Sequence, residues 1–236
     1  RRVLEIDPND AALCIPPAQA LGRIYATKNA HEQLAEVLGI EVRLESDPKT
    51  RRALYERIGT LYETVLGDTG RAIVAWKSRL ADDATDIEAL GALERLYERS
   101  ESWRELVTVL RAREHNTTDA AERRRTMTKA AETLAARLAD VPEAINAWRA
   151  VLDEFGPERP TLAALEELYE LAERWPDLAE TLEVDLSLAE ETADRLDLYA
   201  RLGDVRRLHQ HDLPGALDAY RQALLLDPGN ARGRGA

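Results

Sequence analysis

The sequence predicts an all-α fold, an α-solenoid of about six helical hairpins stacked one on the next. Three observations carry this prediction. Leu, Ala, Glu and Arg dominate the 236 residues, while Gly and Pro are too sparse for a β-rich chain full of turns. A block of sequence returns at a fixed interval along the chain. Each block divides into two helix–turn–helix segments.

The repeat is clearest in three related stretches. "AIVAWKSRL" begins at position 72, "AINAWRAVL" at position 144 and "ALDAYRQAL" at position 216, so the period is 72. Other large apolar residues keep the same interval, as Trp103 does with Trp175 and Tyr97 with Tyr169. Matches of this kind, kept in register along the chain, mark stacked structural units.

The nonamer has a packing explanation. A small alanine at 72, 144 and 216 lets neighbouring helix backbones approach, and a ring follows four residues later, one turn along the same face. Trp76, Trp148 and Tyr220 are these rings. A single hairpin cannot bury such a ring, so its stability comes from its neighbours. We therefore interpret the rings as core residues and not as ligand-stacking residues.

Helical spacing, polar breaks and proline stops divide the chain further. "YERIGTLYETVL" and "LGALERLYERS" each read as a first helix, followed by a short turn and a second helix. The chain is thus predicted to be a single solenoid over 1–236. Its complete hairpins are expected near 17–46, 50–82, 86–115, 120–155, 160–191 and 194–226, with residues 1–6 ending an earlier helix and Cys14 to Pro17 widening the first connection.

The spacing of equivalent positions at Tyr55, Leu90 and Met127 is close to the repeat length of the tetratricopeptide repeat (TPR) family, which the chain resembles. The resemblance lies in Tyr55-x2-Ile58-Gly59-x2-Tyr62 followed by Ala72-x3-Trp76, and again around Tyr199 and Gly203. It implies a right-handed superhelix whose first helices line a concave groove that receives protein partners. The alternate hairpins depart from the pattern, with glutamate or leucine in place of small residues at Glu94, Glu166, Leu106 and Leu178. A related helical-hairpin repeat is the alternative.

Charge and cysteine content narrow the function. The chain carries 44 acidic and 32 basic residues, a net charge of −12, so its surface repels nucleic acid and anionic lipid. Arg123 to Arg125 are read as a solvated helix face. Cys14 is the only cysteine, so no disulfide forms within the chain and no thiolate metal cage is expected. We expect no cofactor, no bound metal and no membrane insertion.

No enzyme signature is present. His31, His115, His209 and His211 are not spaced for joint metal binding, and His31 takes the position of the tryptophans at 103 and 175. Cys14 has no local His or Asn and is read as a buried or loop thiol. We expect a non-enzymatic protein–protein interaction scaffold that binds a peptide or helix of a partner in its groove. The alternative is a regulatory or spacer region of a larger, catalytic polypeptide.

The groove-facing positions follow from the TPR-like alignment. It places Gln19 there, together with these candidate partner-binding residues: Arg23, Glu56, Thr60, Glu63, Arg95, Glu98, Arg99, Lys129, Glu132, Glu167, Glu170, Arg201, Asp204 and Arg207. The family's lysine and asparagine clamp for a terminal carboxylate is not matched. The groove is more basic around Arg95, Arg99 and Lys129 and more acidic around Glu167 and Glu170, which would orient a partner of mixed charge.

Both ends of the sequence suggest a piece of a longer array. There is no initiator methionine, so we expect a fragment, with a cytoplasmic location and, from the excess of Arg over Lys, a bacterial source. Leu224, Leu225 and Leu226 crowd the last helix, where an end cap would be polar. A further helix, or self-association with a second copy, is expected to cover this end.

Overall fold

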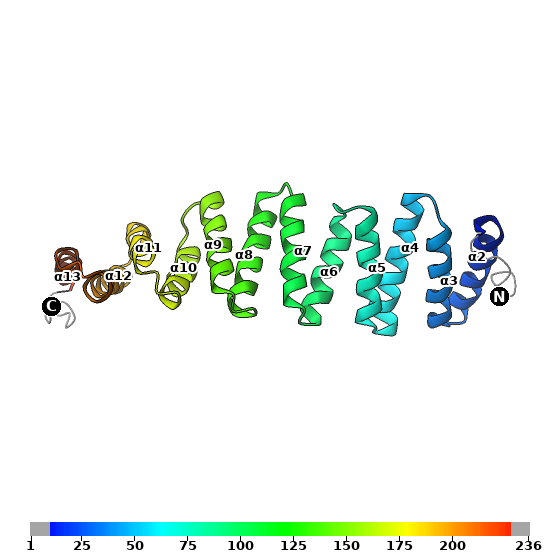
Figure 1. Cartoon of the computed structure of the whole chain (residues 1–236), viewed down its shortest axis with the longest axis horizontal. Helices are drawn as coiled ribbons and strands as arrows, with labels where there is room; N and C mark the ends of the chain where they lie inside the picture. Colours follow the sequence, from blue (N-terminus) through cyan, green and yellow to red (C-terminus); the bar gives the residue numbers. More distant parts are fainter. Residues whose placement is uncertain (1–9, 228–236) are drawn as a thin grey trace. The chain divides into compact units, whose positions relative to one another are not determined.

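The computed structural model describes residues 10–227, and every regular element within them is a helix (Figure 1). The all-α fold built of helical hairpins is confirmed. In chain order the elements are α2 (Ala11–Thr27), α3 (His31–Leu44), α4 (Pro48–Thr60), η1 (Leu61–Leu66), α5 (Thr69–Asp82), α6 (Ile87–Arg99), α7 (Trp103–Asn116), α8 (Ala120–Ala136), α9 (Val141–Phe155), α10 (Arg159–Leu171), α11 (Trp175–Leu188), α12 (Thr192–Val205), η2 (Arg206–Gln210) and α13 (Leu213–Leu226).

The chain divides into two compact units, with the boundary after residue 118. In unit 1, described over 10–118, α2 packs on α3, α4 on α5 and α6 on α7, and α3–α4 and α5–α6 join successive hairpins. In unit 2, described over 119–227, the hairpins are α8–α9, α10–α11 and α12–α13, joined through α9–α10 and α11–α12. A single solenoid over 1–236 stays a prediction. The helix expected at residues 1–6 lies outside the described residues.

The turns repeat as faithfully as the helices. Asp68, Asp140 and Asp212 cap α5, α9 and α13, each accepting a hydrogen bond from the backbone N–H three residues on. The residue before each aspartate has a left-handed backbone, with φ of 66° at Gly67, 51° at Ala139 and 56° at His211. Three further left-handed residues, Asn29, Glu101 and Glu173, are separated by the same period. The repeat therefore extends to backbone conformation.

Alanine and aromatic side chains pack as predicted. Ala72, Ala144 and Ala216 are buried, and Trp76, Trp148 and Tyr220 are 5%, 6% and 3% exposed. Two of the rings lie against glycines of the preceding helix. A Cβ added to Gly59 would lie 2.6 Å from Trp76 Nε1, and one added to Gly203 would lie 2.5 Å from Tyr220 Cε1. These glycines are there because no side chain fits beneath the ring.

Replacing Gly59 with alanine is therefore expected to destabilise the protein. Overpacking a filled core costs about 1–3 kcal/mol. Gly91→Ala is the matched control, because a Cβ at this helical glycine would meet no atom within 4 Å. Relief of the glycine penalty should then stabilise the protein by ~0.5–1 kcal/mol. Urea unfolding of both variants measures the difference, and a Gly59→Ala protein as stable as wild type would contradict this packing.

The first hairpin begins earlier than expected. Cys14 to Pro17 do not form a connection, because α2 starts at Ala11 and runs through Pro16 and Pro17. The Asp10 carboxylate accepts the Leu13 N–H at 3.1 Å and anchors the first turn. Each proline removes one helical hydrogen bond. Cys14 is buried within this helix.

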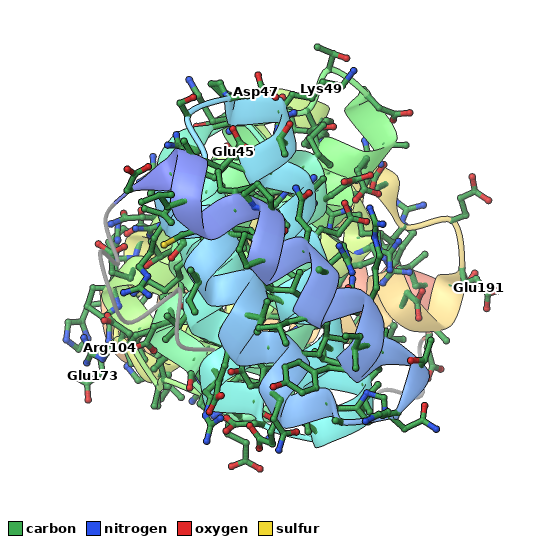
Figure 2. All side chains as sticks on the ribbon, turned by 90° about the vertical axis from the view of Figure 1, so that its right-hand side faces the viewer. Glu45, Asp47, Lys49, Arg104, Glu173 and Glu191 are labelled. Atoms are coloured by element: carbon green, nitrogen blue, oxygen red, sulfur yellow. The ribbon has the colours of Figure 1, made fainter. Side chains whose placement is uncertain are left out.

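Charged side chains cover the turns and outer faces. α2 faces the viewer in Figure 2, where Glu45 and Asp47 mark the turn that leads from α3 into α4. Asp47 caps α4, and Pro48 takes the first helical position. In unit 2, Arg123 and Arg124 pair with Glu154 and Glu158, in line with a solvated helix face.

Candidate functional site

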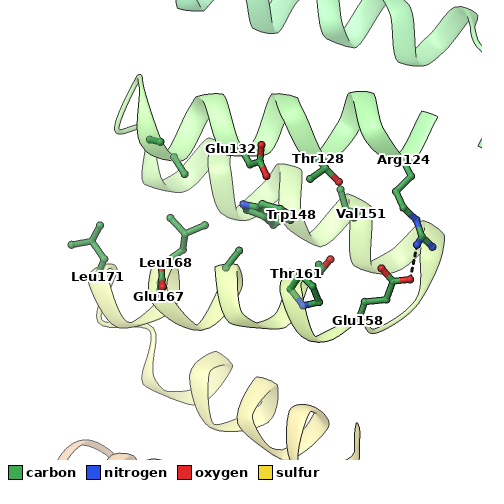
Figure 3. A pocket seen from close by; sticks show the side chains of 14 residues that line it. Arg124, Thr128, Glu132, Trp148, Val151, Glu158, Thr161, Glu167, Leu168 and Leu171 are labelled. Carbon is green, nitrogen blue, oxygen red and sulfur yellow. Dashed lines mark hydrogen bonds and ion pairs between the residues drawn. The ribbon is translucent and has the colours of Figure 1, made fainter. Parts of the chain in front are cut away.

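Unit 2 contains a cavity of about 600 Å³, which we call the Trp148 cavity. It opens between α8, α9 and α10 (Figure 3). Its lining residues are Arg124, Thr128, Glu132, Ala135, Ala136, Trp148, Val151, Glu158, Pro160, Thr161, Ala164, Glu167, Leu168 and Leu171.

The walls of the Trp148 cavity are apolar and its mouth is acidic. Figure 3 shows the Trp148 ring between α8 and α10, with Leu168 and Leu171 rising from α10. Leu171 is 70% exposed. Glu132 and Glu167 lie at the mouth and are exposed, and neither carboxylate makes a hydrogen bond or ion pair with any described residue. An apolar group flanked by positive charge would match both properties.

The corresponding place in unit 1 is a smaller cavity with more charged side chains in its lining. A cavity of about 410 Å³, the Thr60 cavity, is lined by Glu56, Thr60, Glu63, Thr64, Trp76, Ile87, Glu88, Gly91, Ala92 and Arg95. Most of these residues stand one repeat period before residues of the Trp148 cavity. The decisive difference is at Val151, because its counterpart in unit 1 is Arg79.

Arg79 is 3% exposed and joins three helices. Its Nε donates to Asp86 Oδ2 at 2.8 Å, its Nη1 to Glu56 Oε2 at 3.1 Å, and its Nη2 also bonds Glu88. The guanidinium lies over the Trp76 ring, 5.4 Å from its centroid. Burial by itself would raise the pKa of Asp86, but the hydrogen bonds from Arg79 and from the Ala89 N–H outweigh it and lower the pKa.

A third cavity, of about 450 Å³, opens between α2, α3 and α4, and we call it the Glu41 cavity. It is lined by Gln19, Gly22, Arg23, Ala26, Leu38, Glu41, Thr50, Ala53, Leu54 and Arg57. Glu41 is 6% exposed, and its carboxylate makes no hydrogen bond or ion pair among the described residues. Burial raises the pKa of the Glu41 carboxyl, and the Arg57 charge offsets this only in part.

The raised pKa of Glu41 gives a pH-dependent stability effect. The folded protein holds the Glu41 proton more tightly than the unfolded chain, so the contribution of Glu41 to stability falls as pH rises through the raised pKa. Glu41→Gln should therefore raise the melting temperature at pH 7 and have little effect near pH 4. The other charged groups lining this cavity are Arg23 of α2 and Arg57 of α4. Thermal unfolding at both pH values tests this, and a loss of stability at pH 7 would contradict it.

The predicted groove residues divide among these features. Seven line cavities: Arg23 lines the Glu41 cavity, Glu56, Thr60, Glu63 and Arg95 line the Thr60 cavity, and Glu132 and Glu167 line the Trp148 cavity. The other seven, which line none of these three cavities, are Glu98, Arg99, Lys129, Glu170, Arg201, Asp204 and Arg207. Their role in partner binding stays a prediction.

Several of these side chains already bond within the chain. Arg201 donates to Glu166 at 2.6 Å, and Asp204 accepts the Tyr220 hydroxyl at 2.7 Å. In unit 1, Arg95 lies 3.6 Å from Glu63, and Arg99 donates to the Thr69 hydroxyl at 2.9 Å. The charges of Arg201 and Arg95 are therefore partly neutralised before any partner binds, whereas the hydroxyl groups of Tyr220 and Thr69 leave the charges of Asp204 and Arg99 in place.

Reasoning from the sequence missed the apolar half of the site and the two buried charges. The sequence places Trp148 in the core alone, yet its side chain also lines the Trp148 cavity. Val151 and Leu171 were not singled out, nor were Arg79 and Glu41. Comparing the repeats position by position singles out Val151, Arg79 and Leu171, because Arg79 aligns with Val151, and Leu171 with Arg99. It does not single out Glu41, because the counterpart in unit 2, Asp185, is also acidic.

His31 and His209 lie in separate places in the structure and make different contacts. The His209 ring stacks on Trp175, with ring centroids 3.6 Å apart, and the Nδ1 atom of His31 is buried without a hydrogen-bond partner. Over residues 10–227 no group of three or more His, Cys, Asp or Glu side chains is placed to hold a metal ion. Within that same range, no helix is both long and apolar enough to cross a membrane.

Part of the chain is similar to a known family of repeat proteins. The tetratricopeptide repeat family model matches residues 161–196, which cover α10, α11 and the start of α12. That match falls on a hairpin in which Glu166 and Leu178 replace the small residues expected. No curated protein matches the sequence.

Among solved structures, the C-terminal part of a TPR repeat-containing protein from Cytophaga hutchinsonii is similar, at 13% identity and a TM-score of 0.45 over 96% of this chain and 87% of that one. The protein pilF of Pseudomonas aeruginosa is similar over 95% of this chain and 97% of that one, at 14% identity and a TM-score of 0.39. MamA is similar over 72% of this chain and 95% of that one, at 19% identity and a TM-score of 0.43.

The sequence repeat, the stacked hairpins of each unit and the match at residues 161–196 define the class. The chain is a TPR-like helical-hairpin repeat protein.

Proposed function

We propose that this chain is a non-enzymatic protein–protein interaction scaffold, and that the Trp148 cavity anchors a partner. The occupant is an apolar side chain, leucine or phenylalanine, on a partner segment that carries lysine or arginine on either side. The observation that supports this most is an apolar cavity of about 600 Å³ whose mouth holds two unpaired carboxylates.

The size and surface of the cavity fit such an anchor. Pockets that hold one large side chain gain most of their affinity from that buried group, and the surrounding polar contacts add specificity. Here Trp148, Val151 and Leu168 offer the apolar walls, and Leu171 extends them outward. Water displaced from these surfaces favours association by ~25 cal/mol per Å² of apolar area.

The charged residues at the Trp148 cavity determine which partner segments it favours. Arg124 is the cation at this cavity, and it is already paired with Glu158. Glu132 and Glu167 are left to face an incoming segment, and they favour basic over acidic flanks. The net charge of −12 acts in the same direction at long range.

Synthetic peptides test the proposal. The probes are fluorescein-labelled nonapeptides with a central leucine between pairs of lysines, the same peptide with a central alanine, and one with glutamates in place of the lysines. Fluorescence anisotropy should show the first binding at least about tenfold more tightly than the others, since about 1.4 kcal/mol corresponds to a factor of ten.

Charge reversal at the mouth should switch this preference. The double variant Glu132→Lys/Glu167→Lys is expected to lose the lysine-flanked peptide. Glu180→Lys/Glu190→Lys is the matched control, with the same change in net charge at two exposed residues outside the cavity. Equal affinities for all three peptides, or equal losses in both double variants, would reject the proposal.

The last helix supports a second mode of association, with a further helix or a second copy. Leu217 is 41% exposed, whereas Ile145, at the same repeat position, is 2% exposed in α9, which α10 covers. Leu213 and Leu225 are also exposed. We propose that this face of α13 is covered in the intact protein, either in a self-associated dimer or as part of a longer polypeptide. Light scattering of wild type and of Leu217→Ser/Leu225→Ser distinguishes these, because only the dimer predicts a concentration-dependent mass that the variant loses.

A further inference from the structure

The residues around the Glu41 cavity have counterparts in unit 2, two repeat periods further along the chain, where charged side chains pair with one another. The two places are built on equivalent helices, since α3 (His31–Leu44) and α11 (Trp175–Leu188) begin and end at matching repeat positions. Leu38 and Leu54 of the Glu41 cavity correspond to Leu182 and Leu198 in unit 2.

In unit 2 this place holds two ion pairs. Arg201 Nη1 donates to Glu166 Oε2 at 2.6 Å, and Arg159 Nε donates to Asp185 Oδ1 at 3.0 Å. Glu166 and Asp185 are 3% and 4% exposed. Each of these buried carboxylates is thus paired with a guanidinium group that is partly exposed, and Arg159 also pairs with Asp194. The second oxygen of Glu166, Oε1, is buried without a hydrogen-bond partner.

In unit 1 one member of each pair is missing. Gly22 stands where unit 2 has Glu166, and Ile15 stands where it has Arg159. The members that remain are Glu41, in place of Asp185, and Arg57, in place of Arg201. Neither side chain makes a hydrogen bond or an ion pair with any described residue, and both line the cavity.

The backbone at Gly22 has room for a side chain to begin. A Cβ built on Gly22 would lie 3.7 Å from Glu41 Oε1 and 3.7 Å from Leu34 Cδ1, which are ordinary van der Waals distances. The same distance shows that the buried Glu41 carboxylate faces Gly22. Gly22 therefore leaves open a space that its counterpart in unit 2 fills with a carboxylate.

We propose that the Glu41 cavity binds a ligand that carries both a guanidinium or ammonium group and a carboxylate. The cation pairs with Glu41 at the buried end, and the carboxylate pairs with Arg57, and with Arg23, at the open end. The ligand then restores the two ion pairs that unit 2 makes with its own side chains. An arginine, either as a free amino acid or as the last residue of a protein, has this chemistry. The site lies in unit 1 and stands or falls independently of the Trp148 cavity.

Small arginine derivatives test the site by isothermal titration calorimetry on the whole chain. N-acetyl-L-arginine carries both charges, its amide lacks the carboxylate, and N-acetyl-L-citrulline lacks the cation. The first is expected to bind at least about tenfold more tightly than the other two. Free L-arginine identifies the source: tighter binding than the acetylated form indicates a free amino acid, and equal binding indicates a terminal residue of a protein.

Variants locate the binding. Glu41→Gln and Arg57→Gln should each weaken N-acetyl-L-arginine at least about tenfold, and the matched control Glu36→Gln, at an exposed residue of the same helix, should not. The double variant Ile15→Arg/Gly22→Glu, which copies unit 2, should fold and no longer bind. No saturable heat with wild type, or the same affinity in Glu41→Gln, would overturn the proposal. The proposal would also be overturned if a double-mutant cycle showed that Glu41 and Arg57 stabilise each other in the folded protein and no ligand bound.

Discussion

Replacing Trp148 with alanine is expected to destabilise the protein by ~3–5 kcal/mol. The ring is 6% exposed and stands one turn after the buried Ala144, so its loss leaves a void between α8, α9 and α10. The surrounding helices cannot close over it, because each is already held by its other neighbours. Chemical denaturation measures the effect.

Two control variants separate packing from other causes. Trp148→Phe keeps most of the apolar volume and should recover more than half of the lost stability. Leu171→Ala, at a residue that lines the same cavity but is 70% exposed, should change stability by less than about 0.5 kcal/mol. A Trp148→Ala protein that unfolds like wild type would show that the ring does not hold the hairpins together.

Replacing Arg79 with valine is expected to cost about 3–5 kcal/mol, although valine is the natural residue one repeat period later, at Val151. Removing the guanidinium leaves Asp86, which is 3% exposed on its side chain, with the Ala89 N–H at 3.0 Å and the more distant Arg52, 3.4 Å away. Breaking a buried ion pair costs more than never having formed it, because an uncompensated charge remains. Urea unfolding at pH 7 measures this loss.

The pH dependence of the Arg79→Val deficit identifies its cause. The folded-state pKa of Asp86 lies below its unfolded value, so the carboxylate contributes stability above the unfolded pKa of about 3.9 and loses it as pH falls through the lowered pKa. The difference between wild type and Arg79→Val should therefore shrink in acid. Adding Asp86→Asn to the variant should recover part of the loss at pH 7. A deficit that stays constant with pH would assign the effect to packing alone.

Most of the fold could be predicted from the sequence, because the repeat consists of large apolar side chains that are stable only when they are buried. A tryptophan or tyrosine four residues after a buried alanine is covered by a neighbouring helix, so Trp76, Trp148 and Tyr220 each mark a contact between elements. The prediction was wrong at Pro16 and Pro17, because proline ordinarily interrupts a helix and the sequence therefore indicated a connection there. The Asp10 cap and the packing of α2 on α3 nevertheless keep the helix continuous.

The sequence predicted the polar residues of the candidate sites but not the residues that form their cavities. The groove alignment selected polar residues such as Glu132 and Glu167 because it names positions on a helix face. It could not show that Val151 opens a cavity where Arg79 draws Glu56 and Glu88 together. Cavity volume depends on several side chains from different helices, and it changes when any one of them is replaced.

The period, the all-α class and the burial of the repeated rings are thus determined by the sequence alone, because they depend on residues within one hairpin and its nearest neighbours. Which buried charges find partners was decided by the tertiary structure. Glu166 meets Arg201 across two hairpins, whereas Glu41 makes no hydrogen bond or ion pair with any described residue and has only the more distant Arg57 charge to offset its burial. The cost of burying a charge depends on groups far away in the chain, and only the folded helices bring them together or leave them apart.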